Sequence, residues 1–365
     1  MHTATTLAPT APHTVRPGVP VTPRPRFAVS RPARAGLRLM ITSLRSVMRT
    51  VPTRVVVAWA KVLGGVGILA VLLWRVGTGP FLDGLRLINV WALVAALAIG
   101  ALTTVCCAWR WSIVSEGLGV RLPLGAAVAH CYRSVFLNST LPGGVIGDVD
   151  RAVRHGKDAG DVGRGVRAVV WERTAGQIVQ AVIAVIVLFA CPSPVQRYLP
   201  VASVVAIVAG ALVYVVLRAL PRRGPSRFAR AMRTAERDVR DGLLANGNWF
   251  GILVASSVVV GGHLAMFVVA ARTAGATAPL SLLVPLTLLA LLAMGLPLNI
   301  GGFGPREGVA AWAFAAAGLT ADQGITTALV YGALALASSL PGAAVLIMRR
   351  LRFSGWLSGE GQLGG

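Results

Sequence analysis

The chain has 365 residues, of which 55% are hydrophobic and only 13% are charged, and its mean hydropathy is +0.71. Soluble globular domains carry about 25% charged residues, so this composition excludes a soluble protein and predicts an integral membrane protein. The formal net charge is +22, and it comes almost entirely from arginine. Blocks of arginine between apolar stretches orient a chain in the bilayer and bind anionic headgroups. We therefore expect membrane lipids, and not nucleic acid, as the partner.

The first part of the chain, residues 1–54, is rich in Pro, Thr, Ala and Arg and has little apolar periodicity. These features predict a disordered, basic, cytoplasmic tail. It is not a secretory signal peptide, because the first long apolar run begins only after it and no small-residue cleavage site follows that run. A misassigned upstream start codon would explain the tail equally well. Residues 55–350 are predicted to form the membrane domain, and residues 351–365 a short cytoplasmic tail.

Apolar windows of about 20 residues, the length that crosses a hydrocarbon core, recur along the membrane domain. Two further stretches, 124–147 and 307–319, are apolar but short or interrupted. The seven full windows cover residues 55–74, 89–109, 167–190, 200–217, 248–271, 279–298 and 326–348.

The arginine-rich segments predict the topology, since short loops with Arg belong in the cytoplasm. Suppose that 124–147 enters the membrane and returns to the same side, while 307–319 crosses. All the arginine-rich segments then lie on one side of the membrane: the two tails and the loops 151–167 and 218–240. If 124–147 instead crossed fully, the loop 218–240 would be exported. We therefore predict an all-α, polytopic transmembrane helical bundle with eight spans, one re-entrant segment, and both termini on the cytoplasmic side of the inner membrane.

A break interrupts the apolar stretch 124–147. Asn138 precedes Leu141-Pro142-Gly143-Gly144, where proline removes a backbone donor and glycine relaxes the backbone, so a helix should end here. Peptide groups freed at membrane depth are tolerated only where they are buried in protein or line a wet cavity. Transporters place such broken helices at their substrate sites. The alternative is a structural kink followed by a polar loop.

Acidic residues follow this break at Asp148 and Asp150. An Asp-x-Asp pair can hold a metal ion and a nucleotide-sugar diphosphate in some glycosyltransferases, but no nucleotide-binding domain surrounds this one. We therefore prefer Asp148 as the partner of a nearby arginine such as Arg151. No metal or other cofactor is expected.

Charged residues also occur inside apolar segments. Placing Arg133 at bilayer depth would cost about 2.5–3.5 kcal/mol, so it should face a cavity or an acidic partner, unless it extends to the interface. Glu172 and Arg173 point in directions about 100° apart on a helix and are expected to pair with other segments. The preferred partners of Glu172 are Arg133 and Arg151.

A second Gly/Pro-rich break lies between the windows 279–298 and 326–348, and its composition is similar to that of the first. Two apolar segments interrupted in this way are the best sequence indication of a transporter's binding site. The second break includes Pro297, Asn299, Gly301, Gly302, Gly304, Arg306 and Glu307.

Together, the two breaks and the Glu172-Arg173 pair resemble the lysylphosphatidylglycerol synthase transmembrane-region family. This flippase-like domain also forms the amino-terminal half of the multiple peptide resistance factor. The resemblance covers about residues 55–350 and implies an inner-membrane protein that moves lipid or lipid-linked molecules between leaflets without its own ATPase. The chain stops at Gly365 without a soluble domain able to use aminoacyl-tRNA, so it is not expected to make lysylphosphatidylglycerol. The long Pro/Arg tail is also outside the family pattern.

The leading hypothesis is a lipid flippase without enzymatic activity, in which arginines attract an anionic or zwitterionic headgroup and acidic residues hold the arginines when the site is empty. Two alternatives stay open: a non-transporting partner of a lipid- or polymer-synthesising enzyme, and a membrane-embedded transferase that uses Asp148 and Glu172. The predicted headgroup-binding residues are Arg133, Asn138, Pro142, Gly143, Gly144, Asp148, Arg151, Glu172, Arg173, Asn299, Gly301, Gly302, Gly304, Arg306 and Glu307.

Overall fold

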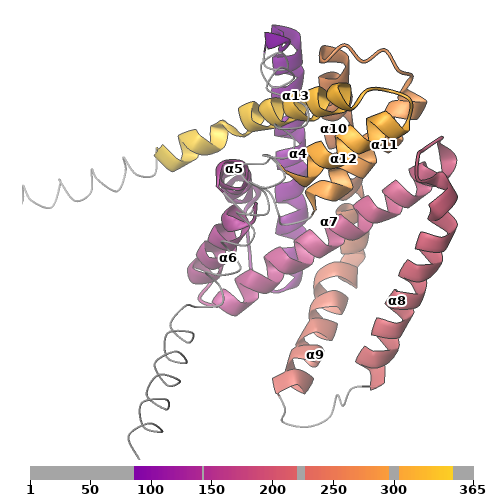
Figure 1. The fold of residues 1–365 in the computed structure, drawn as a ribbon. Helices are drawn as coiled ribbons and strands as arrows, with labels where there is room; N and C mark the ends of the chain where they lie inside the picture. Colours follow the sequence, from indigo (N-terminus) through magenta and orange to yellow (C-terminus); the bar gives the residue numbers. More distant parts are fainter. Residues whose placement is uncertain (1–85, 142–143, 220–226, 296–303, 348–365) are drawn as a thin grey trace, which may run out of the picture. The chain divides into compact units, whose positions relative to one another are not determined.

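The computed structural model describes a helical protein, as Figure 1 shows. No strand occurs in the described residues, which confirms the predicted all-α class. Both predicted tails, the window 55–74, and the centres of the two Gly/Pro-rich breaks lie outside them. The described residues are 86–141, 144–219, 227–295 and 304–347.

Four of the helices are long and apolar enough to cross a membrane. They coincide with the predicted windows 89–109, 167–190, 248–271 and 326–348, so the chain is a multi-pass membrane protein. Their continuous helical stretches have 26 to 29 residues, and at a rise of about 1.5 Å per residue each exceeds the roughly 30 Å of a hydrocarbon core. These helices are α4 (Val90–Gly117), α7 (Val162–Ala190), α10 (Asn248–Thr273) and α13 (Ala321–Ser339), whose apolar stretch continues to Ile347.

The remaining helices are shorter or carry more charge. α8 coincides with the window 200–217, and α9 is followed by a π-helical turn, Asp238–Leu244. Their bounds are α5 (Leu124–Thr140), α6 (Ile146–Asp158), α8 (Leu199–Ala219), α9 (Arg227–Arg237), α11 (Leu280–Met294) and α12 (Pro305–Ala316).

Helices α5 and α6 form a hairpin. They pack against each other, and the residues before α5 line the same cavity as the end of α6. The two helices have 17 and 13 residues, so each is about 20–26 Å long and shorter than a membrane crossing. The described residues on either side of the break, Leu141 and Gly144, therefore lie at the same end of a half-length hairpin.

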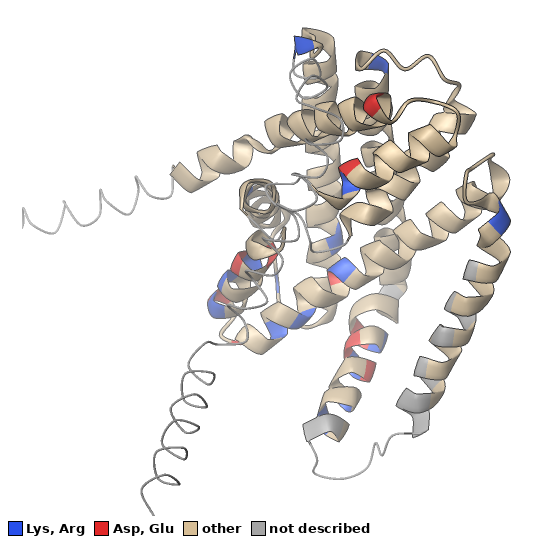
Figure 2. Cartoon of the chain, in the orientation of Figure 1, with Lys and Arg blue, Asp and Glu red and all other residues tan. Residues whose placement is uncertain are grey.

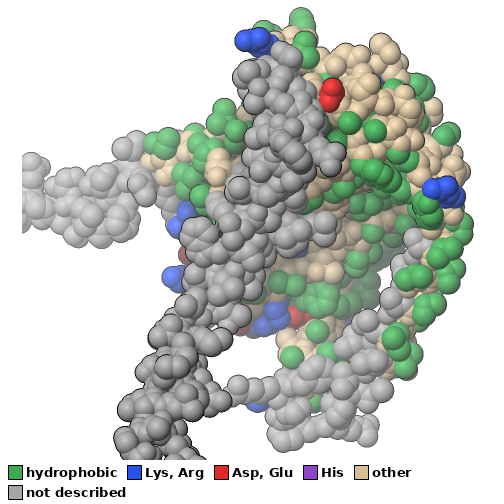
Figure 3. Space-filling model, in the orientation of Figure 1, with side chains coloured by type: hydrophobic (Ala, Val, Ile, Leu, Met, Phe, Trp, Pro, Cys, Tyr) green, Lys and Arg blue, Asp and Glu red, His purple; other side chains and the backbone are tan. Residues whose placement is uncertain are grey.

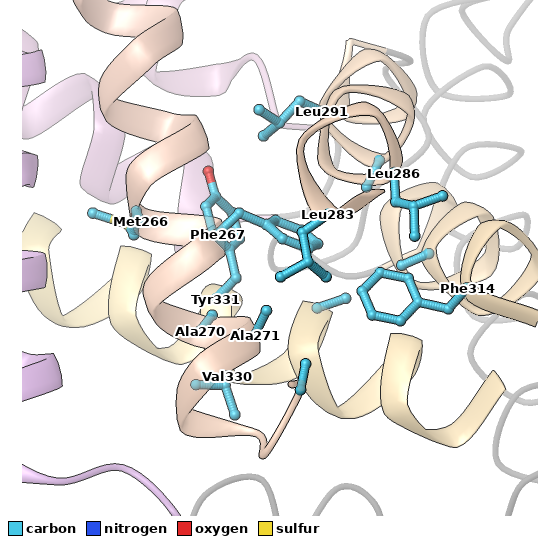
Figure 4. Packing of buried hydrophobic residues seen from close by; sticks show 14 of the residues in the cluster. Met266, Phe267, Ala270, Ala271, Leu283, Leu286, Leu291, Phe314, Val330 and Tyr331 are labelled. Atoms are coloured by element: carbon cyan, nitrogen blue, oxygen red, sulfur yellow. The ribbon is translucent and has the colours of Figure 1, made fainter. Parts of the chain in front are cut away.

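Helices α11 and α12 form a second hairpin. In Figure 4, Leu283 and Leu286 of α11 point toward Phe314 near the end of α12, so the two helices run antiparallel. They have 15 and 12 residues, or about 18–22 Å. The segments 279–298 and 307–319 were each predicted to cross the membrane. In the described residues, the helix in each segment is too short to cross. The predicted total of eight spans stays a prediction.

Close packing at small residues holds the long helices together. A Cβ atom on Gly100 of α4 would lie 2.4 Å from the Cβ of Ser338 in α13, and one on Gly262 of α10 would lie 2.4 Å from Cγ2 of Thr103. Such contacts let helix backbones approach closely in a membrane, where no hydrophobic effect drives helices together. Around these contacts, Phe267 and Tyr331 belong to the largest buried apolar cluster (Figure 4).

Apolar side chains also cover much of the outer surface, as Figure 3 shows for one face. α8 exposes a row of branched residues in which Val201, Val208 and Leu212 are each at least 60% exposed. This amount of exposed aliphatic surface is typical of helices in contact with lipid.

The charged residues are concentrated on α6, the first half of α7 and α9 (Figure 2). Arg164 and Arg167 at the start of α7 and Arg237 at the end of α9 line a cavity of about 370 Å³, together with Gly117 at the end of α4. The side chain of Asp238 joins this region, since it pairs with Arg167 Nε at 2.8 Å. Arg164 and Arg167 of the loop 151–167 and Arg237 of the loop 218–240 thus lie at the same end of the bundle, as the predicted topology requires.

Candidate functional site

Glu172 is the centre of a buried group of charges. Its side chain is completely buried in the middle of α7, and its Oε1 accepts hydrogen bonds from Nε of Arg110 at 2.9 Å and from Nη2 at 2.5 Å. Its Oε2 accepts a hydrogen bond from Nη2 of Arg151 at 2.5 Å. Arg110 belongs to α4 and Arg151 to α6, so one carboxylate connects three helices. The predicted Glu172–Arg151 pair is present.

Arg110 was not predicted by the sequence reasoning. The apolar window 89–109 ends just before it, whereas α4 continues to Gly117 and carries Arg110 into the helix bundle. Nη1 of Arg110 also donates a hydrogen bond to the hydroxyl of Ser256 in α10 at 2.9 Å. The available signal was an arginine between two tryptophans directly after an apolar window. All three guanidinium nitrogens of Arg110 therefore have acceptors.

Asp148, in the first turn of α6, extends this group toward the surface. Its Oδ1 accepts a hydrogen bond from the hydroxyl of Ser134 at 3.0 Å and lies 3.2 Å from Nε of Arg151. Its Oδ2 accepts a hydrogen bond from Nδ2 of Asn138 at 3.1 Å and pairs with Nη2 of Arg173. Arg173 is 47% exposed, in contrast to the two buried arginines. We call Arg110, Asp148, Arg151, Glu172 and Arg173 the Glu172 cluster.

Asn138 closes the break between α5 and α6. Its Oδ1 accepts a hydrogen bond from the backbone N–H of Gly147 at 2.7 Å, while its amide nitrogen donates to Asp148. Gly147 lies against the backbone of α5, since a Cβ there would be 2.1 Å from the carbonyl oxygen of Ser134. Gly144 has a φ of +61°, which favours glycine. Pro142 and Gly143 lie outside the described residues.

Of the two arginines predicted as partners of Glu172, Arg151 and Arg133, the described contacts show Arg151. The Nε and Nη2 atoms of Arg133 lie 3.0 and 3.1 Å from the carboxylate of Asp150. Asp150 also accepts a hydrogen bond from Nε of Arg154 at 2.9 Å. Asp150 lies two residues after Asp148 and therefore on another face of α6, so this second pairing separates Arg133 from Glu172.

The second break ends in a charged pair at the start of α12. Oε2 of Glu307 accepts a hydrogen bond from the backbone N–H of Gly304 at 2.6 Å, which caps the helix, and Oε1 accepts one from Nε of Arg306 at 2.9 Å. Both side chains are buried. Arg306 lies over the ring of Tyr331 at 5.0 Å, and the Tyr331 hydroxyl is 2.9 Å from Nδ1 of His263. The predicted residues Asn299, Gly301 and Gly302 lie outside the described residues.

Both charged sites lie within the part of the chain that matches the sequence profile of a known protein family. The profile of the family described as "Lysylphosphatidylglycerol synthase TM region" matches residues 57–342, which is more than half of the chain. The chain belongs to this family. The resemblance drawn from the two breaks and Glu172-Arg173 is thereby confirmed, and the family links the protein to lipid metabolism or transport. Comparisons with curated proteins and with solved structures gave no match.

In this member of the lysylphosphatidylglycerol synthase transmembrane-region family, the Glu172 cluster carries a charge imbalance. It contains three arginines and two carboxylates, which gives a net charge of one positive. The two buried arginines share Glu172, and Arg151 and Arg173 share Asp148, so the excess positive charge belongs to all three arginines together. A guanidinium donates parallel hydrogen bonds to carboxylate or phosphate, so the cluster can accept one further anionic oxygen group at its exposed side.

Proposed function

We propose that the protein is a flippase that moves a phospholipid, or another lipid-linked molecule with a phosphate in its headgroup, between the leaflets of the inner membrane. The observation that carries the proposal is the Glu172 cluster: a fully buried carboxylate held by two buried arginines, next to a half-exposed third arginine. No enzymatic activity is part of this proposal.

The energetics of buried charge support a role in substrate handling. An ionised residue within a membrane domain is costly, and replacing a buried ion pair by apolar residues is often neutral or stabilising. Stability therefore gives little reason to place Glu172 among long apolar helices. A phosphate group is tetrahedral, but two of its oxygens can accept the same pair of parallel hydrogen bonds from an arginine as a carboxylate does, so it can take the place of one.

Arg173 is where a headgroup would bind first. Its side chain is 47% exposed and pairs with Asp148. A phosphate that displaces Asp148 from Arg173 would approach Arg151, which lies 3.2 Å from the same aspartate. Displacement of one carboxylate at a time would let the headgroup enter the cluster without leaving any arginine unpaired. The acyl chains would stay in lipid, beside exposed apolar helices such as α8.

The two half-length hairpins support a transport mechanism in a second way. We infer that the helix pairs α5–α6 and α11–α12 are both re-entrant, because transporters bind substrate at broken helices within the membrane. If α11 and α12 form a re-entrant hairpin, the two crossings predicted for 279–298 and 307–319 are replaced by none, and the number of crossings falls by two. Both termini would therefore still lie in the cytoplasm.

Reconstituted vesicles test the proposal. Purified protein should accelerate leaflet exchange of fluorescent phosphatidylglycerol in proteoliposomes. Arg173→Gln should slow this exchange about tenfold or more, because a charge-assisted hydrogen bond contributes about 1.5–3 kcal/mol. Arg240→Gln is the matched control, since Arg240 is 74% exposed and forms an ion pair with the neighbouring Asp241. Its exchange rate should equal that of the wild type.

The same experiment separates the alternatives. Exchange that is unchanged in Arg173→Gln would overturn the assignment of the site. No exchange of phosphatidylglycerol, phosphatidylethanolamine or a polyprenyl-phosphate lipid would favour the non-transporting partner, and product formation from a soluble donor and a lipid acceptor would favour the transferase. For topology, single cysteines at Lys157 and Arg240, in a background without native cysteines, should be protected from an impermeant reagent added outside.

A further inference from the structure

A second polar cavity lies at the arginine-rich end of the bundle and shares no lining residue with the Glu172 cluster. Its volume is about 340 Å³, at the small end of the range for ligand pockets. It is enclosed by the loop between α4 and α5, the first turn of α5, the end of α6 and the start of α7. The polar side chains that line it are Arg121, His130, His155, Asp158 and Arg164.

His155 is the least accessible of these polar side chains. It is only 4% exposed, and its Nε2 has no hydrogen-bond partner within the described part of the chain. A buried polar atom without a partner costs about 1–3 kcal/mol, and such atoms are rare in folded proteins. The ring of His155 is held in place against Trp111, with ring centroids 5.1 Å apart. His155 thus carries a ring nitrogen without a partner among the described residues, beside a cavity that the same side chain helps to line.

The surroundings of His155 favour an anion. Two arginines line the cavity, of which Arg121 is exposed and Arg164 makes only a long contact of 3.5 Å with Asp161. Asp158 is the one acidic residue of the lining. In addition, α5 begins at the cavity with no side-chain cap, and Ala126 of its first turn belongs to the lining. The free N–H groups and the positive end of the helix dipole favour a negative charge there.

The loop that forms one wall is fixed before any ligand binds. The hydroxyl of Ser112 donates a hydrogen bond to the carbonyl oxygen of Leu122 at 2.7 Å, and the N–H of Val120 donates one to the carbonyl oxygen of Ser115 at 2.9 Å. Gly119 turns the chain with a φ of +78°. A preformed wall reduces the entropy lost on binding, so a small anion can be held by few contacts.

We propose that this cavity is a phosphate-binding site, occupied by the phosphomonoester of either a lipid headgroup or a soluble metabolite. His155 donates to a phosphate oxygen at the base of the cavity, and Arg121 and Arg164 bind the other oxygens at its mouth. Trp111 contacts both groups, since its ring centroid lies 5.1 Å from that of His155 and 4.8 Å from the Arg151 guanidinium. The site does not depend on transport by the Glu172 cluster.

Binding measurements on the full-length protein test this proposal. One arm titrates inorganic phosphate and glycerol 3-phosphate into detergent-solubilised protein by calorimetry. The other arm counts the lipids retained by native mass spectrometry after purification from nanodiscs of phosphatidic acid in phosphatidylcholine. Arg121→Gln should weaken binding about tenfold in whichever arm shows it, and His155→Asn should do the same. Arg121 is exposed, so its replacement is not expected to disturb folding.

Arg240→Gln is the charge-matched control and should bind as the wild type does, while Arg173→Gln reports separately on the Glu172 cluster. Binding in the first arm alone assigns a soluble phosphomonoester, and binding in the second alone assigns a lipid headgroup. Either result supports the site if Arg121→Gln weakens it and Arg173→Gln does not. The proposal is overturned if neither arm shows binding, or if Arg121→Gln binds as well as the wild type. Loss of leaflet exchange in Arg173→Gln with retained phosphate binding would keep the two sites distinct.

Discussion

The Glu172 cluster and the Arg306–Glu307 pair contain the same residue types but connect different parts of the molecule. Glu172 holds arginines that are 62 and 21 residues away in the sequence and belong to two other helices. Glu307 holds its immediate neighbour Arg306 and the backbone of Gly304, and thereby caps its own helix. Two sequence motifs of similar composition thus form an interhelical junction in one case and a local helix start in the other.

This difference changes what each site can do on binding a ligand. A phosphate that displaces Glu172 or Asp148 would loosen contacts between α4, α6 and α7, which is how a substrate can change helix packing. The same event at Glu307 would expose the first turn of α12 and free Arg306, which lies over Tyr331. We therefore expect the Glu172 cluster to respond to substrate and the Arg306–Glu307 pair to stabilise the second hairpin.

The largest expected effect is that of Glu172→Gln. The substitution keeps the shape of the side chain but removes the carboxylate that holds Arg110 and leaves Asp148 as the acidic partner of Arg151, and breaking a buried ion pair costs about 3–5 kcal/mol. We expect a loss of this size in the free energy of unfolding, measured by equilibrium unfolding in mixed micelles, together with loss of leaflet exchange. Glu116→Gln, at an exposed position near the end of α4, is the matched control and should change neither quantity.

A Glu172→Gln variant within about 1 kcal/mol of the wild type would contradict this account. It would mean that Arg110 and Arg151 find other acceptors, such as the Ser256 hydroxyl that already binds Arg110. The junction between the three helices would then rest on apolar packing alone.

A smaller effect is expected for Glu307→Gln. The glutamine oxygen can still accept the hydrogen bond from Gly304, as glutamine does at this position of a capping box. Only one arginine loses its carboxylate, and it keeps its contact with the ring of Tyr331. The expected loss in the free energy of unfolding is about 2 kcal/mol. Leaflet exchange should fall less than in Glu172→Gln; an equal or larger fall would remove the distinction between the two sites.

The sequence predicted the apolar architecture well, because lipid imposes a simple rule on length and composition. The four long helices coincide with four of the predicted windows, and both Gly/Pro-rich breaks separate short helices. Helix lengths at those breaks were harder to predict. The segment 307–319 is apolar enough to suggest a crossing, but α12 has only 12 residues. The orientation of this short helix depends on its packing against α11, which composition does not reveal.

The site was predicted only in part, for a related reason. Asp148, Arg151 and Glu172 stand out as charges next to a break or within an apolar run, and they lie together in the structure. Arg110 was missed because hydropathy windows end at a charge, although a helix continues through one whose partner lies elsewhere. Arg133 was expected to need an acidic partner, but only the folded hairpin shows that this partner is Asp150. Pairings between distant segments depend on three-dimensional packing that composition does not encode.

The smallest expected effect, and the sharpest test of the geometry around Glu172, is that of Gly176→Ala in α7. A Cβ at this position would lie 2.8–2.9 Å from the guanidinium of Arg110, so the arginine must shift away from Glu172. Alanine stabilises a helix by up to about 1 kcal/mol relative to glycine, which offsets part of the strain, so the free energy of unfolding should change by no more than about 1 kcal/mol. Leaflet exchange should nevertheless slow severalfold, because the arginine no longer presents its nitrogens in the native direction. Gly261→Ala in α10, where a Cβ meets nothing within 4 Å, provides the same helix stabilisation and should leave exchange unchanged. If the two variants exchanged lipid equally fast, the position of the Arg110 guanidinium would not matter for transport, and the Glu172 cluster would be no more functional than the cap at Glu307.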